Sequence, residues 1–137
     1  LFLSARAQHI ASLIEPAIAR GAVVICDRFS DSTLAYQGFA RGLGVDEILS
    51  VVNYAEASCK PDRTYLLDLD PFVGFHRIKK RKASDRIEKA GFAFHESVRE
   101  GFLELARRFS ERICVVDASD SIEEVFQTVL KDLNERF

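Results

Sequence analysis

The segment DRFSDSTLAYQG, residues 27–38, gathers side chains that could bind a phosphorylated small molecule. Asp27 and Arg28 follow the apolar run AVVIC, so a buried strand would deliver a carboxylate and a guanidinium to the end of a sheet. A carboxylate there can hold a magnesium-bound water, and the guanidinium can bind a phosphate through two hydrogen bonds. The alternative for a bare Asp-Arg pair is a structural ion pair at a strand end.

The residues that follow Arg28 favour a ligand site over a structural ion pair. Ser32 and Thr33 carry small hydroxyls, and Tyr36 and Gln37 come about one turn later on the same expected helix. The amide of Gln37 has both an acceptor and donors, which suits the edge of a nucleobase. The pattern therefore predicts a polar pocket close to Arg28.

A second pair of interest is Phe2 and Arg6, which are four residues apart and share one face of an expected helix. An aromatic ring can stack on a planar base while an arginine reaches a base carbonyl. The alternative is a core phenylalanine beside a surface arginine.

The segment HRIKKRKASDRIEKAG, residues 76–91, holds six lysines and arginines between Arg77 and Arg86. Such a run is usually a solvated helix face. Near the mouth of a sheet it also suits a lid that brings arginines onto phosphates. A nucleic-acid patch is a further alternative, although no aromatic residues are interleaved with the basic ones.

The composition is that of one globular domain. The chain has 137 residues, 47% of them hydrophobic and 29% charged, with a net charge of −2. These values argue against a general nucleic-acid binder and against a basic membrane-surface protein, and no apolar run is long enough to span a membrane. The three cysteines have no CxxC spacing, so neither a disulfide framework nor a zinc site is predicted; Cys26 and Cys114 are expected to be buried thiols.

Strands that alternate with helices are expected to position these residues. Strands are predicted at 22–27, 63–70 and 112–119, and helices at 1–20, 31–40, 45–58, 71–82, 93–110 and 121–137. This order predicts an α/β fold, with a parallel sheet covered by helices on both faces and ligands beyond the carboxyl ends of its strands.

Several local features are expected of these helices. Pro16 should bend or restart the first helix and Gly21 should end it. Asp31 or Ser32 should cap the helix at 31–40, and Asp70 should cap the helix that begins at Pro71. The last helix is expected to bury one apolar face, made of Ile122, Val125, Phe126, Val129, Leu130 and Leu133.

Taken together, these segments resemble bacterial thymidylate kinase. The resemblance rests on FxxxR at 2–6, EPAIARG at 15–21, DRFSDSTLAYQGFARG at 27–42, KPDRTYLLDLDP at 60–71 and DRIE at 85–88, and it extends over essentially the whole chain, 1–137. It implies a P-loop-kinase-like α/β fold and transfer of the γ-phosphoryl group of ATP to dTMP with Mg²⁺. It also implies a cytoplasmic homodimer that packs helices around 1–20 and 45–58, with no nucleic-acid or membrane partner.

The same resemblance implies a role for each site residue. For dTMP, Phe2 would stack on thymine, Arg6 would reach O4, and Ser32, Thr33 and Gln37 would line the base pocket, with Tyr36 near the deoxyribose and Arg28 on the phosphate. Asp27 would lie near the metal and the phosphates. Arg81 and Arg86 would be catalytic arginines of a lid at 77–91, and Arg77, Arg81 and Ala118 would contact ATP.

Two departures from the family pattern stand out. Pro71 is followed by Phe72 where the family often has glutamate, which leaves the chemistry unaffected. More important, no GxxxxGK[ST] occurs in the sequence, so the cradle for the β- and γ-phosphates is missing from it. The chain has no methionine and opens inside an uncapped helix. We therefore expect a fragment, with the phosphate loop and the first strands ahead of Leu1, that is inactive alone.

Two rival functions remain open from the sequence. One is a deoxynucleoside kinase of the same superfamily, in which Arg28 would face the transferring phosphate. The other is a non-catalytic binding module for nucleotides or nucleic acids that uses the basic stretch at 77–86.

Overall fold

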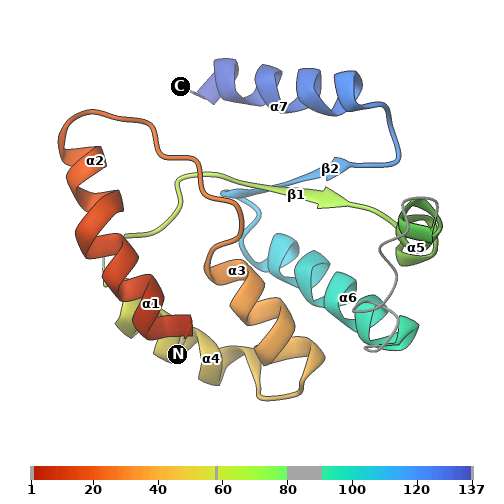
Figure 1. Cartoon of the computed structure of the whole chain (residues 1–137), viewed down its shortest axis with the longest axis horizontal. Coiled ribbons are helices and arrows are strands. Elements are labelled where there is room, and N and C mark those ends of the chain that lie inside the picture. Colours follow the sequence, from red (N-terminus) through yellow and green to blue (C-terminus); the bar gives the residue numbers. More distant parts are fainter. Residues whose placement is uncertain (1, 58, 80–90, 137) are drawn as a thin grey trace. The chain divides into compact units, whose positions relative to one another are not determined.

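The computed structural model of this chain describes residues 2–57, 59–79 and 91–136. They form two compact units, Leu1–Asp62 and Arg63–Phe137. The first unit is helical, and the second contains a parallel sheet between helices (Figure 1). None of the helices in these ranges is both long and apolar enough to cross a membrane.

The first unit opens with a helical rod made of three segments. These are α1 (Phe2–His9), the π-helix η1 (Ile10–Ile14) and α2 (Glu15–Ala19). Pro16 lies in the first turn of α2 and has no N–H to donate, so the regular α pattern is interrupted next to it. Gly21, at φ +78°, ends the rod, and its N–H donates to the carbonyl of Ile18 over 2.8 Å. Both expectations for this rod are confirmed.

Two further helical segments complete the first unit. The short α3 (Ser30–Thr33) continues as the π-helix η2 (Leu34–Ala40), and α4 (Val45–Glu56) packs against both η2 and α1. Gly38 allows this close approach, because a Cβ at this position would lie only 3.1 Å from Val45 Cα. The core of this unit consists of buried apolar side chains from three of these segments, η1, η2 and α4: Ile10, Ile14, Leu34, Ala35 and Val52.

The strand predicted at 22–27 is not formed. Val23 and Ile25 are 91% and 93% exposed, and no strand in the described part of this unit lies beside them. An extended segment becomes a strand only when a neighbour completes its ladder of hydrogen bonds, and apolar composition alone does not supply one. For the same reason Cys26, expected to be buried, is exposed.

The expected cap of the next helix is also wrong. The helix begins at Ser30, one residue earlier than predicted, and Phe29 occupies the cap position without a side-chain hydrogen bond. The carbonyl of Phe29 accepts the N–H of Ser32 over 3.2 Å. Asp31 therefore lies inside the first turn, where it is buried and where the helix dipole favours its charge.

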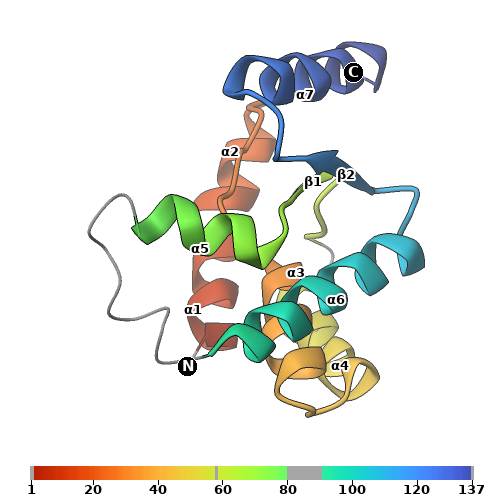
Figure 2. The same ribbon diagram turned by 90° about the vertical axis from the view of Figure 1, so that its right-hand side faces the viewer.

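The second unit is built on two parallel strands. β1 (Thr64–Asp68) pairs with β2 (Ile113–Asp117) in a register that runs from Thr64 opposite Ile113 to Asp68 opposite Asp117. The views show α6 (Phe92–Arg108) along one face of the pair and α7 (Ile122–Arg136) along the other (Figures 1 and 2). This layered arrangement confirms the predicted α/β class. It also brings Asp68 and Asp117 together at the carboxyl edge of the sheet.

Side-chain caps begin two helices of this unit. Asp70 Oδ1 accepts the N–H of Phe72 over 2.8 Å at the start of α5 (Pro71–Lys79), as predicted. At α7, Ser121 and Glu124 form a capping box, in which Ser121 N donates to Glu124 Oε2 over 3.0 Å and Glu124 N donates to Ser121 Oγ over 3.3 Å.

The predicted inward face of α7 is only half right. Val125, Val129 and Leu133 are partly buried, but Ile122 is 90% exposed and Phe126 is 53% exposed. Leu130, at 36%, is also exposed. The two strands of this unit offer a surface too narrow to cover the whole apolar stripe of the helix.

Candidate substrate-binding site

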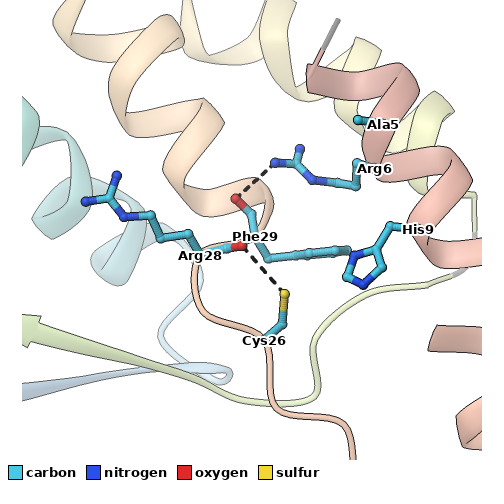
Figure 3. A pocket seen from close by; sticks show the side chains of 6 residues that line it. All are labelled: Ala5, Arg6, His9, Cys26, Arg28 and Phe29. Carbon is cyan, nitrogen blue, oxygen red and sulfur yellow. Dashed lines mark hydrogen bonds between the residues drawn. The ribbon is translucent and has the colours of Figure 1, made fainter. Parts of the chain in front are cut away.

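Arg6 is the centre of the site in the first unit. Its Nη2 donates to the carbonyl of Phe29 over 3.2 Å and to Thr33 Oγ1 over 3.0 Å. The guanidinium carbon also lies 5.1 Å from the centre of the Phe29 ring, within the range of a cation–π contact. Figure 3 shows the guanidinium reaching from α1 towards the start of α3. The structure thus brings together two residues that the sequence assigned to one pocket.

The opposite side of Arg6 faces a buried acid that the sequence analysis missed. Arg6 Nη1 lies 3.7 Å from Glu56 Oε1, and the two side chains are only 13% and 3% exposed. A signal for this pair existed, because Glu56 follows the core residue Val52 by four positions and so shares its helix face. A carboxylate on a core-facing position requires a charged or polar partner.

Asp27 and Arg28 lie on the segment that leads into α3. Both are exposed, and Arg28 has φ +60°, in the left-handed region that non-glycine residues seldom occupy. The Arg28 guanidinium carbon is 5.4 Å from the centre of the Tyr36 ring. Strained conformations of this kind concentrate at ligand sites, where they direct a side chain. The structure thus brings the Arg28 side chain next to Tyr36, the residue that the sequence placed in the same pocket.

A pocket of about 310 Å³ lies next to Arg6 (Figure 3). Its lining consists of Ala5, Arg6, His9, Cys26, Arg28 and Phe29. Two arginines contribute to this lining, so the pocket suits an anionic ligand, and its volume is at the lower end of the range for small-molecule sites. His9 and Cys26 were not predicted to line it, although His9 follows Arg6 by three positions on the same helix.

The remaining residues of the predicted base pocket lie on the continuous helical segment formed by α3 and η2. Ser32 and Gln37 are half-buried, on α3 and η2. The backbone carbonyl of Gln37 accepts the N–H of Leu43 over 3.3 Å. Gln37 and Tyr36 both lie within the π-helix, and such segments occur frequently at functional sites.

The second unit holds the residues predicted to contact ATP. Arg77, on α5, donates from Nη1 to the carbonyl of Ala118 over 3.0 Å and from Nη2 to the carbonyl of Ser119 over 3.4 Å. Two residues that are 41 positions apart, and that the sequence assigned to one ligand, therefore touch each other.

Other predicted site residues lie beyond what the structure describes. Arg81 and Arg86 fall in the segment 80–90, outside the described residues, and the side chain of Phe2 is likewise outside them. Within the described residues, no group of three His, Cys, Asp or Glu side chains could hold a metal ion.

Comparison with known proteins assigns the chain to a family. A family model described as thymidylate kinase matches residues 1–129. The chain belongs to the thymidylate kinase family. This membership confirms the resemblance inferred from the sequence motifs, and it confirms a P-loop-kinase-like fold class.

Curated thymidylate kinases are similar along most of the chain. The protein of Geobacillus sp. (strain WCH70) is 50% identical over 128 residues, which cover 92% of this chain and 61% of the relative. That of Geobacillus thermodenitrificans is 46% identical over 128 residues, covering 92% and 57%. That of Bacillus cytotoxicus is 43% identical over 133 residues, covering 96% and 64%. The chain thus spans about three fifths of the length of these thymidylate kinases.

Proposed function

We propose that this chain forms the dTMP-binding part of a thymidylate kinase that transfers the γ-phosphoryl group of ATP to dTMP. The observation that carries the proposal is the hydrogen bond between Arg6 and Thr33, because it joins the FxxxR motif to the DRxxxST motif beside a pocket. The pocket also contains Arg28. A cationic pocket next to hydroxyl and amide side chains suits a nucleoside monophosphate.

The base and the phosphate of dTMP have separate partners in this proposal. Phe2 stacks on thymine and Arg6 reaches its O4, while Ser32, Thr33 and Gln37 line the base pocket. Tyr36 packs near the deoxyribose. Arg28 holds the phosphate, and its contact with the Tyr36 ring supports this placement because it fixes the long arginine side chain near the sugar position.

Asp27 is the residue that we assign to Mg²⁺. It offers one exposed carboxylate next to the phosphate-binding Arg28. Mg²⁺ in kinase sites usually keeps several waters and is bound by one or two carboxylates together with substrate phosphates, so a single carboxylate acting through water is sufficient. The bound ion would neutralise charge on the phosphates; Asp27 would orient one of its waters.

The donor nucleotide is assigned to residues of the second unit and of the basic segment. Arg77 and Ala118 contact ATP, and their mutual hydrogen bond supports a common site. Arg81 and Arg86 are proposed as the catalytic arginines of a lid at 77–91, and Arg81 is also proposed to contact ATP. Arginines that reach the γ-phosphoryl group in the closed state stabilise charge that develops in the transition state.

We also propose that the 137-residue chain alone does not turn over ATP. Its sequence contains no GxxxxGK[ST], and phosphoryl transfer depends mostly on positioning and charge stabilisation by such a loop. The curated relatives are longer than this chain, which spans about three fifths of their length. We propose that a thymidylate kinase of that full length, called the complete enzyme below, carries this loop. Formation of dTDP by the isolated chain above background would contradict this part of the proposal.

A cytoplasmic homodimer is the proposed assembly. The helices implied in dimer contacts carry exposed apolar side chains: Leu13 (57%) and Ile18 (53%) on the first rod, and Val51 (50%) and Tyr54 (90%) on α4. Groups of exposed apolar residues mark interaction surfaces. Sedimentation of the complete enzyme as a dimer, and of a Tyr54→Asp variant as a monomer, would support this assignment; an unchanged dimer would contradict it.

Calorimetric binding of dTMP and thymidine to the complete enzyme tests the proposed acceptor. We expect dTMP to bind more tightly than thymidine, and we expect Arg28→Met to remove most of the difference because it removes the phosphate partner. Equal affinity for the two ligands, together with phosphorylation of thymidine, would instead identify a deoxynucleoside kinase.

A further inference from the structure

Arg99, on α6, binds the carboxyl end of strand β1. Its Nε donates to Asp68 Oδ1 over 2.7 Å and its Nη2 donates to Asp68 Oδ2 over 2.8 Å, which is a two-pronged contact with one carboxylate. Arg99 Nη1 also lies 3.7 Å from Asp70 Oδ2. Paired hydrogen bonds of this geometry fix direction as well as distance.

The backbone of Asp68 supports the turn that follows β2. Its carbonyl accepts the N–H of Ala118 over 2.8 Å, one residue past the last pair of the sheet. Within the turn, Asp117 Oδ1 accepts the N–H of Ser119 over 2.8 Å. The residue that Arg99 holds by its side chain therefore holds Ala118 by its main chain.

The other side of the turn is supported by α5. Arg77 donates to the carbonyls of Ala118 and Ser119 over 3.0 and 3.4 Å. Asp70 caps the start of helix α5 with one carboxylate oxygen, and its second carboxylate oxygen faces Arg99. Arg99 therefore contacts both supports of the turn: it binds Asp68 directly, and it faces Asp70 at the start of α5.

Charge explains why one arginine is needed at this edge. The parallel register places Asp68 opposite Asp117 at the ends of both strands, and Asp70 follows two positions after Asp68. The pKa of Arg99 is raised above its ordinary value, mainly by its hydrogen bonds to Asp68 and further by the charges of Asp70 and Asp117. Removal of the guanidinium would take away the positive charge that offsets these carboxylates.

We propose that Arg99 is a positioning residue for the phosphoryl donor: it fixes the turn at Ala118 and Ser119 so that the turn can receive the base of ATP. The proposal rests on the proposed function, which assigns Ala118 to ATP. Backbone groups recognise a base edge only when their positions are held, since loose groups lose binding free energy to ordering. Arg99 itself does not touch the nucleotide.

The competing interpretation is that Arg99 only stabilises the fold, and the chain supplies a control for it. At the opposite end of β1, Arg63 donates from Nε to Asp132 Oδ2 over 2.8 Å and pairs with the other carboxylate oxygen through Nη2. The two pairs are chemically alike, but Arg63 supports no turn at the carboxyl edge. Arg63→Met therefore removes a matched ion pair without disturbing Ala118.

Steady-state kinetics of the complete enzyme separate the two interpretations. We expect Arg99→Met to raise KM for ATP roughly tenfold or more, while kcat and KM for dTMP change by less than about threefold. Arg99→Lys should recover part of the loss, because it restores one charge without the two-pronged contact. Arg63→Met should lower the melting temperature without a selective change in KM for ATP. Equal changes in both KM values after Arg99→Met, or none, would overturn the proposal.

Amide hydrogen exchange of the same enzyme tests the turn without any need for activity. Arg99→Met should speed exchange at the amides of Ala118 and Ser119, and Arg63→Met should leave these two amides unchanged. Unchanged exchange after Arg99→Met would overturn the positioning role. If the complete enzyme failed to phosphorylate dTMP, the proposed function would be wrong, and so would the role of Arg99 in ATP binding. Hydrogen exchange would still decide whether Arg99 holds the turn.

Discussion

Arg6 and Thr33 are joined by a hydrogen bond of 3.0 Å, although they are 27 positions apart in the sequence. The bond links α1 to α3 and orients an arginine whose side chain is 13% exposed. Because Glu56 faces the other edge of the same guanidinium, the orientation of Arg6 is fixed from two sides before any ligand binds. A preorganised donor of this kind reduces the ordering cost of binding a base.

The hydroxyl of Thr33 should therefore contribute to dTMP affinity. Thr33→Val keeps the shape of the side chain but removes the acceptor of Arg6 Nη2, leaving that nitrogen with the Phe29 carbonyl alone. We expect dTMP affinity of the complete enzyme to fall by about 1–2 kcal/mol, roughly five- to thirtyfold. Titration calorimetry measures this.

Thr128→Val is a matched control for this substitution. The Thr128 hydroxyl donates to the carbonyl of Glu124 over 2.9 Å on the exposed side of α7, so its loss should leave dTMP binding unchanged. Equal losses in the two variants would show that the Thr33 effect is not specific to the base pocket.

Periodicity and turn chemistry predicted most of the elements of this chain. The bounds of α4, β1 and β2 agree with prediction to within a few residues because apolar spacing and the cap residue Asp70 are local signals. The segment 22–27 differs because a strand depends on a neighbour that local sequence does not specify. Arg6 and Thr33 were assigned to one site from motifs, whereas Glu56 and Arg99 were missed. Their roles depend on helix packing and strand register, which become visible only in three dimensions.

Gly38 should be sensitive to substitution because the backbone of a neighbouring segment packs closely against it. A Cβ at this position would lie 3.1 Å from Val45 Cα and 3.3 Å from Gly44 O, and both are backbone atoms that cannot turn aside. We expect Gly38→Ala to lower the free energy of unfolding by about 1–3 kcal/mol, measured by urea denaturation.

Gly74 provides the control for this prediction. A Cβ on Gly74 would meet only Leu69 Cδ2 at 3.8 Å, an ordinary contact, and the residue lies inside α5. Gly74→Ala should be neutral or should raise stability by up to about 1 kcal/mol, because alanine favours the helix. A similar loss of stability in both variants would contradict the packing argument.

Arg81 is expected to act on kcat rather than on dTMP binding. The γ-phosphoryl group in transfer spreads negative charge over three oxygens, and an arginine brought to it in the closed state stabilises the transition state more than bound ATP. Arg81→Met in the complete enzyme should lower kcat about 100-fold, roughly 2.7 kcal/mol, with a smaller change in dTMP affinity. Arg86→Met is the comparison variant. An intact kcat after Arg81→Met would move the catalytic role to another residue.

Asp132 should make the stability of the second unit depend on acid pH. Its carboxylate accepts hydrogen bonds from Arg63 Nε over 2.8 Å and from the Tyr65 hydroxyl over 2.6 Å. The Arg63 hydrogen bond, followed by that of Tyr65, holds the pKa of Asp132 below its ordinary value. Since the folded pKa is the lower one, the carboxylate stabilises the fold above the unfolded pKa, and this contribution is lost as pH falls through the folded pKa.

Urea unfolding of the wild-type chain and of Asp132→Asn, from neutral pH down to about pH 3, tests this linkage. Asparagine keeps the size of the side chain but carries no charge, so the variant should be less stable at neutral pH, and the difference should shrink steadily on acidification. Tyr65→Phe, which keeps the Arg63 pair, should retain most of the pH dependence. A stability difference between wild type and Asp132→Asn that stays constant with pH would mean that the charge of Asp132 contributes nothing to the fold.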